Sequence, residues 1–192
     1  MSFYTGTQAE LLYALPAAVT KNTYTTEAVL SVPTSSTLPH CIVPGNFFSS
    51  VPNGIGRVLY LHAQGTIANT AAATFQGRIG WDTTQGTIAN AITYWPTLAP
   101  TASVTSLWNL DVWYTCQQVG SAGVTLQVNG EFRQSVVASG TLSTAPQSVM
   151  FQTSLTGINA EVASYIELFG TWGASSASNT TTLHQMQLAG WN

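Results

Sequence analysis

The chain has 192 residues, of which 45% are hydrophobic and only 6% are charged, with four basic and seven acidic side chains and a formal net charge of −3. An average soluble domain is about 25% charged, so this surface must consist mainly of hydroxyl, amide and small apolar groups, as in proteins that pack against copies of themselves. Four scattered cations exclude the basic stripe that nucleic-acid binding requires, and the lack of an apolar run of about 18 residues excludes a membrane-spanning helix.

The length predicts a single domain over residues 1–192, with residues 1–15 as a candidate extended arm. Residues 1–6 show no charged segment followed by an apolar one, so we expect synthesis in a cytoplasm rather than secretion. Cys41 and Cys116 can form at most one disulfide, and in a cytosolic product two buried free thiols are favoured.

The first third of the chain contains few clear elements. Residues 7–15 could form a short helix that Pro16 would end, or a strand near residues 11–15. Strands are predicted at residues 27–32 and 56–64, with residues 33–39 as an extended connector.

One hexapeptide occurs twice, as Gln64-Gly-Thr-Ile-Ala-Asn69 and again at residues 85–90. Each copy follows a predicted strand, so two similar loops could lie on one rim and present Ile67 and Ile88 as a contact surface. The alternative is two ordinary glycine-initiated turns, because one pair is fewer than the three units of a repeat architecture.

The clearest strand covers residues 108–116. Its alternation places one set of side chains on an apolar face: Trp108, Leu110, Val112, Tyr114 and Cys116. Trp113 breaks the pattern on the polar face, where a large aromatic residue is more often a contact or packing residue than a ligand platform. The strand should therefore belong to a half-buried sheet with Trp113 exposed.

The segment 124–134 contains Asn129-Gly130, a hairpin signal. A two-residue loop would mix apolar and charged groups on both faces. A three-residue loop with Gly130 in a left-handed bulge instead pairs Leu126 with Phe132 and keeps each face of one kind, so we predict that register.

Further strands are predicted at residues 74–81, 148–153, 164–172 and 180–188, with a flexible loop at 173–179. About eight to ten short strands separated by turn residues predict an all-β fold, a single antiparallel β-sandwich that is jelly-roll-like.

The sequence contains no catalytic motif. His40, His62 and His184 each stand alone, and His184 shares a strand face with Met186 and Leu188, which predicts a core or interface residue. Cys41 follows His40, but nothing marks the two as a catalytic dyad. No loop has alternating acidic ligands for calcium, so we predict neither a metal site nor a cofactor.

Carboxylate pairs and tryptophans were the other candidates for chemistry. Asp111 with Glu167, or Glu161 with Glu167, could hydrolyse glycosides, but no pattern brings either pair together, and we predict no enzymatic activity. Six tryptophans could stack on sugars: Trp81, Trp95, Trp108, Trp113, Trp172 and Trp191. Most lie in predicted strands or at their ends, which favours core and intersubunit packing.

The last quarter of the chain contains the run Tyr165-Ile-Glu-Leu-Phe-Gly-Thr-Trp-Gly, a Ser/Asn-rich loop and the return strand Leu183-His-Gln-Met-Gln-Leu188. This segment resembles the closing hairpin of small β-sandwich virion proteins of tailed bacteriophages, particularly those of actinobacterial hosts. The resemblance is residue by residue in this last quarter, and over the rest of the chain it is only one of general sequence character. It implies a head decoration or minor capsid protein, commonly trimeric, on the outer surface of the head.

That resemblance implies self-association as a homotrimer and the major capsid protein as partner. The residues themselves, the tryptophans and the repeated hexapeptide, give a possible contact surface of Trp113, Trp172, Ile67 and Ile88. The sequence predicts neither a nucleic-acid nor a membrane partner. One rival is a tail or fibre component that recognises a host receptor or glycan. A secreted carbohydrate-binding module is another, although it should show a signal peptide.

Overall fold

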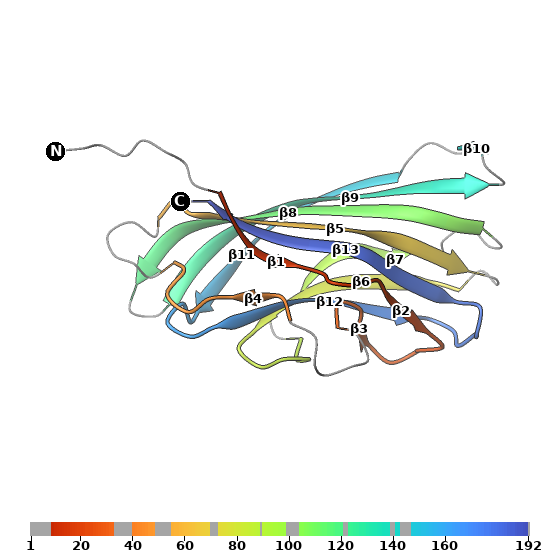
Figure 1. Ribbon diagram of the computed structural model, residues 1–192, viewed down its shortest axis with the longest axis horizontal. Helices are drawn as coiled ribbons and strands as arrows, with labels where there is room; N and C mark the ends of the chain where they lie inside the picture. Colours follow the sequence, from red (N-terminus) through yellow and green to blue (C-terminus); the bar gives the residue numbers. More distant parts are fainter. Residues whose placement is uncertain are drawn as a thin grey trace.

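The computed structural model describes residues 9–32, 40–48, 55–69, 73–88, 90–98, 104–120, 123–138, 141–142 and 147–191. These residues form thirteen strands and no helix, arranged as two antiparallel sheets that pack face to face (Figure 1). The antiparallel β-sandwich predicted from the sequence is confirmed. Three two-residue strands, β3, β4 and β10, raise the number above the expected eight to ten.

The larger sheet has the order β1-β13-β5-β8-β9-β10, with β11 also paired to β9 and β2 to β13. Its strands are β1 (Ala9–Ala14), β2 (Val19–Asn22), β5 (Val58–Asn69), β8 (Val104–Gly120), β9 (Gly123–Ala138), β10 (Thr141–Leu142), β11 (Gln147–Ile158) and β13 (Thr180–Trp191). The chain runs through β8, β9 and β11 as neighbours, so this part of the sandwich is a meander.

The smaller sheet has the order β3-β12-β6-β7, with β4 paired to β12. Its strands are β3 (Ala28–Val29), β4 (Ile42–Val43), β6 (Phe75–Asp82), β7 (Ile92–Leu98) and β12 (Ser164–Trp172). The sequence did not predict β7, which contains Pro96. Proline removes a ladder donor, and β7 tolerates it because it lies at the edge of its sheet.

The core lies between the two sheets and is rich in aromatic rings. Phe132 of β9 in the larger sheet lies 4.4 Å, between ring centroids, from Trp95 and 5.7 Å from Tyr94, both on β7 of the smaller sheet. Trp81 of β6 similarly meets Tyr114 of β8 at 5.3 Å. These contacts across the two layers hold the sheets in register.

The hairpin expected at Asn129-Gly130 is wrong, because β9 continues unbroken through both residues and pairs with β8 over its whole length. Alternation is maintained: Leu126, Val128 and Phe132 are all buried. Gly130 serves close packing and not a turn, since a Cβ there would lie 2.1 Å from Cζ of Phe151.

The two copies of the repeated hexapeptide adopt different conformations. Gln64–Asn69 lies within β5, and a Cβ on Gly65 would come 2.1 Å from the carbonyl oxygen of Thr182 on β13. In the second copy Gly86 has φ +74° and lies in a turn after β6. The prediction of paired loops is therefore wrong: strand neighbours on both sides hold the first copy extended, and tertiary context decides the conformation.

Both ends of the chain differ from the sequence-based expectation. Residues 9–14 of the predicted arm form β1, which pairs with β13, while residues 1–8 lie outside the described part. The resemblance treated β12 and β13 as a closing hairpin. They lie in opposite sheets, so the segment 173–179 crosses from one layer of the sandwich to the other.

Replacing Phe132 with alanine should lower the free energy of unfolding by about 3–5 kcal/mol, because it leaves a cavity among the rings that join the two sheets. Urea denaturation measures this change. Met150→Ala removes a side chain that is 83% exposed and should stay within about 0.5 kcal/mol of the wild type. If Phe132→Ala lowers the free energy of unfolding no more than Met150→Ala does, this account of the core is contradicted.

Candidate contact face on the larger sheet

The side chains of the larger sheet that point away from the smaller sheet form what we call the outer face. Strand register sets them in rows that run across the strands. One row is Tyr60, Trp113, Asn129 and Gln152, and the next is His62, Asp111, Glu131 and Met150. These residues come from β5, β8, β9 and β11, which lie far apart in the sequence. Strand pairing alone brings them together on one surface.

Asp111 is the centre of a polar network on the outer face. Tyr60 donates a hydrogen bond to Oδ1 of Asp111, and Nδ1 of His62 lies 2.9 Å from the same oxygen. Arg133 donates to Oδ2 at 3.2 Å, and its Nε lies 3.3 Å from Glu131. The network gathers three of the chain's few charges and satisfies a carboxylate that its neighbours largely cover.

Hydrogen bonding sets the protonation of this network. Burial alone would raise the pKa of Asp111, but the hydrogen bonds from Tyr60 and His62 and the nearby Arg133 hold it below its ordinary value of 3.8. Burial and the hydrogen bond to Asp111 raise the pKa of Tyr60 to about 12. Asp111 is therefore ionised and Tyr60 neutral at pH 7.

Aromatic side chains line the outer face beside this network. Trp113 is 40% exposed, and its ring centroid lies 5.2 Å from that of Tyr60. Trp191 of β13 lies 5.6 Å from Tyr60 on the other side. Three rings from β8, β5 and β13 thus form a strip across the sheet, with Trp113 as its most exposed end.

A hollow of about 460 Å³ adjoins Trp113, lined by Trp113, Asn129, Gly130, Glu131, Met150, Phe151 and Gln152. Within the described part of the chain, no hydrogen bond is found for the side-chain amides of Asn129 and Gln152. The hollow therefore combines an aromatic wall with amide groups that are available to a partner or ligand.

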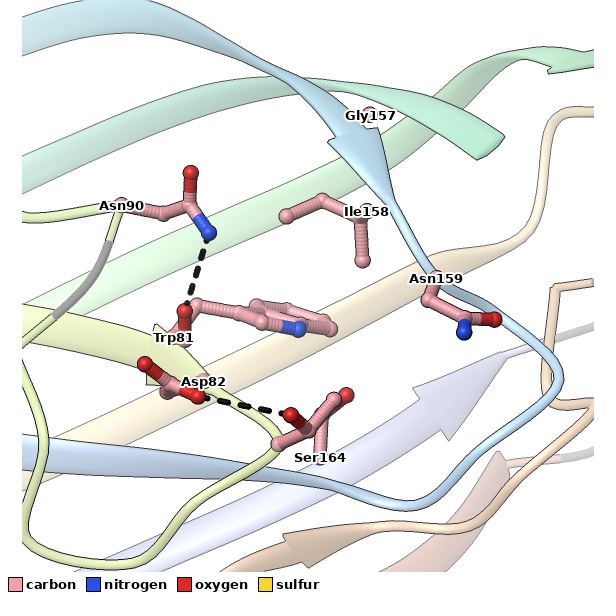
Figure 2. A pocket seen from close by; sticks show the side chains of 8 residues that line it. Trp81, Asp82, Asn90, Gly157, Ile158, Asn159 and Ser164 are labelled. Atoms are coloured by element: carbon pink, nitrogen blue, oxygen red, sulfur yellow. Dashed lines mark hydrogen bonds between the residues drawn. The ribbon is translucent and has the colours of Figure 1, made fainter. Parts of the chain in front are cut away.

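A smaller pocket of about 160 Å³ lies at the rim of the sandwich, beside the end of β6 (Figure 2). Asn90 donates from Nδ2 to the carbonyl oxygen of Trp81 at 3.2 Å, which fixes the loop at the pocket's edge. Ile158 and Asn159 line the opposite side. Its size suits a few water molecules rather than a partner.

The four contact residues predicted from the sequence do not form one surface. Trp113 is exposed as expected, but Trp172 and Ile67 are only 1% and 0% exposed and belong to the core. Both are wrong as contact residues, because they lie on inward positions of β12 and β5. Ile88 is half-buried in the turn that follows β6 and stays a prediction.

The structure also replaces one expectation for the histidines. A bulge between Leu183 and Gln185 lets both Leu183 and Met186 point inward and turns His184 outward, where its Nε2 lies 3.2 Å from the hydroxyl of Thr66. The predicted strand face shared with Met186 and Leu188 is therefore wrong, and so is a core position for His184; an interface position stays a prediction. His40 lies beside Glu167, its Nδ1 3.9 Å from Oε1.

Glu167 is buried in β12 and holds the loop that follows β6. Its Oε2 accepts a hydrogen bond from the backbone nitrogen of Gly86 at 2.7 Å, and burial raises its pKa. It lies in β12 of the smaller sheet, whereas Asp111 lies on the outer face of the larger one. The sandwich therefore keeps Asp111 and Glu167 apart.

The two cysteines fit the sequence-based expectation of buried free thiols. Cys41 and Cys116 are both free and buried, and burial raises the pKa of each thiol, which keeps them protonated and unreactive. Over the described ranges, no group of three or more His, Cys, Asp or Glu side chains is placed to hold a metal ion. The same ranges contain no helix long and apolar enough to cross a membrane.

No protein-family model matches the chain, and no curated protein matches it. Among solved structures, the chain is similar to the CBM2 module of the evolved Dit of Lactobacillus casei BL23 phage J-1. The similarity has 12% sequence identity, covers 97% of each chain and has a TM-score of 0.35. A likeness at this level carries no inference about function, so the outer face must be interpreted from its own residues.

Asp111→Asn should make stability less sensitive to acid. Because the pKa of Asp111 is lower in the folded protein than in the unfolded chain, its stabilisation is present above the ordinary value and is lost as pH falls through the folded value. Urea midpoints measured between about pH 7 and pH 2 should therefore fall more steeply for the wild type than for Asp111→Asn. Gln117→Ala, which removes an exposed amide of β8 and no titratable group, is the control and should show the wild-type slope. Equal slopes for wild type and Asp111→Asn would show that the network does not stabilise the ionised carboxylate.

Proposed function

We propose that this protein is a non-enzymatic structural component of a tailed-phage virion that binds neighbouring protein subunits through the outer face. The observation that carries the proposal is the exposure of large apolar side chains on a surface with few charges. Trp113, Leu107 and Met150 are 40%, 46% and 83% exposed, and all three lie on strands of the larger sheet. Aromatic residues and methionine are enriched in protein interfaces, and charge is depleted from their centres.

The location that we propose is the outer surface of the head, with the major capsid protein as partner. The resemblance of residues 165–188 to head decoration proteins supports this location. A rigid sheet with an apolar strip can clamp adjacent shell subunits, because release then requires several contacts to break together. The separation of Asp111 from Glu167 in different sheets fits a role without catalysis.

The double variant Trp113→Ala, Met150→Ala should bind undecorated heads at least about tenfold more weakly than the wild type, because it removes the exposed apolar centre of the outer face. Sedimentation of purified heads with labelled protein measures the binding. Val162→Ala removes an exposed apolar side chain from the loop before β12 and should bind normally. Equal binding by both variants, or no rise in the rupture temperature of heads when the wild type binds, would contradict the proposal.

A second candidate function is favoured by the hollow beside Trp113. An aromatic wall next to the amides of Asn129 and Gln152 is the chemistry that recognises an uncharged sugar, through stacking and hydrogen bonding. In that case the protein is a tail or fibre component that recognises a host receptor or glycan. Ligand and shell would compete for the same outer face.

Glycan arrays distinguish the two functions. If the second candidate is correct, the wild type binds a defined set of neutral glycans, and Trp113→Ala and Asn129→Ala each weaken binding by about tenfold or more. Gln117→Ala removes an exposed amide of β8 outside the hollow and should leave binding unchanged. If the wild type binds no glycan but binds heads tightly, the glycan function is contradicted and the head function is supported.

A further inference from the structure

We infer that β11 is a self-association edge, through which two copies of this chain pair their larger sheets across a two-fold axis into one continuous antiparallel sheet. The pairing surface is the backbone edge of β11, which borders the outer face, whereas the proposed function uses the side chains of the outer face, so the inference goes beyond the proposed function. It requires no shell subunit and no ligand.

The first observation is that β11 is long, regular and paired on one side. Residues 147–155 pair with β9 in an uninterrupted register, and the ladder becomes irregular only between Leu155 and Ile158. Among the strands that the structure describes, none other forms a ladder with β11. Its second side therefore presents a row of backbone donors and acceptors that another strand can satisfy.

The second observation is that residues 147–155 of β11 lack the features that normally protect an edge. Its twelve residues, Gln-Ser-Val-Met-Phe-Gln-Thr-Ser-Leu-Thr-Gly-Ile, include no charged residue and no proline. Proteins usually interrupt such edges with lysine, proline, bulges or very short strands. An open strand of this composition would aggregate unless a specific partner covers it.

The opposite edge of the same sheet shows that protection is available in this chain. There β1 and β2 are only six and four residues long, and they carry Glu10 and Lys21. A bulge between Leu11 and Tyr13 further distorts the ladder. Protection at one edge and its absence at the other favour β11 as a surface built to pair.

The partner that β11 fits best is another β11. An antiparallel pair centred on Gln152 sets Val149 against Leu155 and Phe151 against Thr153 on the inner face, and Met150 against Ser154 on the outer face. Each pair joins uncharged residues, and no like charges meet. Thr153 is exposed although its position is an inward one, which leaves room on the inner face for the Phe151 side chain of a second copy.

Two-fold pairing of this kind closes on itself. Each copy uses its β11 edge once, so the assembly stops at a dimer and leaves no free copy of the edge. It differs from the trimer that the phage resemblance implies, and the mass of the purified protein separates the two. It also leaves both outer faces on the same side of the joined sheet, available for other contacts.

The test is the mass of the purified full-length chain by sedimentation equilibrium, alone and as charge variants. The wild type should have twice the chain mass of 20.3 kDa. Gln152→Lys and Gln152→Glu each place like charges opposite each other at the axis and should weaken dimerisation by about tenfold or more, while an equimolar mixture of the two should dimerise again. Gln117→Lys adds the same charge at an exposed position of β8 and should dimerise like the wild type.

A wild type that is monomeric or trimeric at micromolar to millimolar concentration would overturn the inference. So would a dimer that Gln152→Lys does not weaken more than Gln117→Lys does, or a Lys/Glu mixture that stays monomeric. Circular dichroism of each variant checks that the sandwich is folded, which it should be because Gln152 is exposed. Failure here leaves head binding unaffected, because that function was assigned to the outer face and is measured separately.

Discussion

The packing of aromatic rings between the two sheets is the interaction on which the rest of the structure depends. Phe132 contacts rings of β7 and β8, and the layer contacts extend through Trp81 and Tyr114 to the other end of the core. These contacts fix which face of β8 and β9 points inward, and a period of two then fixes every residue that points outward. The position of Trp113 on the outer face is thus a consequence of the burial of Trp108, Val112 and Tyr114.

Several of the few charged side chains are paired with one another in the structure. Arg78 donates two hydrogen bonds to the carboxylate of Glu27, from Nε to Oε1 at 2.7 Å and from Nη2 to Oε2 at 2.5 Å. The network on the outer face contains Asp111, Glu131 and Arg133. Most of the remaining surface is hydroxyl, amide or apolar, which lowers the desolvation cost of covering it with protein. A surface of this kind suits the large, lasting protein contacts that we propose.

The sequence was most informative where alternation was strict. Residues 108–116 and 164–172 form strands as predicted, the second with the same bounds as β12. Local signals failed where neighbouring strands decided the conformation: Asn129-Gly130 is extended, and identical hexapeptides form a strand in one place and a turn in another. β7 was not predicted because it contains Pro96. The bulge between Leu183 and Gln185 places His184 on the opposite face from Met186, whereas the sequence predicted the same face.

The candidate site could be predicted only in part for the same physical reason. Trp113 was identified because its position breaks the alternation of a single strand, which is local information. Trp172 and Ile67 are buried because they take inward positions on β12 and β5, and Asn129 and Gln152 reach the hollow through ladder register. Register between strands distant in sequence depends on the whole sheet, and no short motif carries it.

The most direct test of the central claim is the copy number of this chain in purified virions relative to the major capsid protein, by quantitative mass spectrometry. A protein that clamps the head through its outer face should be present at a copy number comparable with that of the major capsid protein. A far smaller number would contradict the head location and favour the tail or fibre. Complete absence from the particle would contradict a virion role altogether.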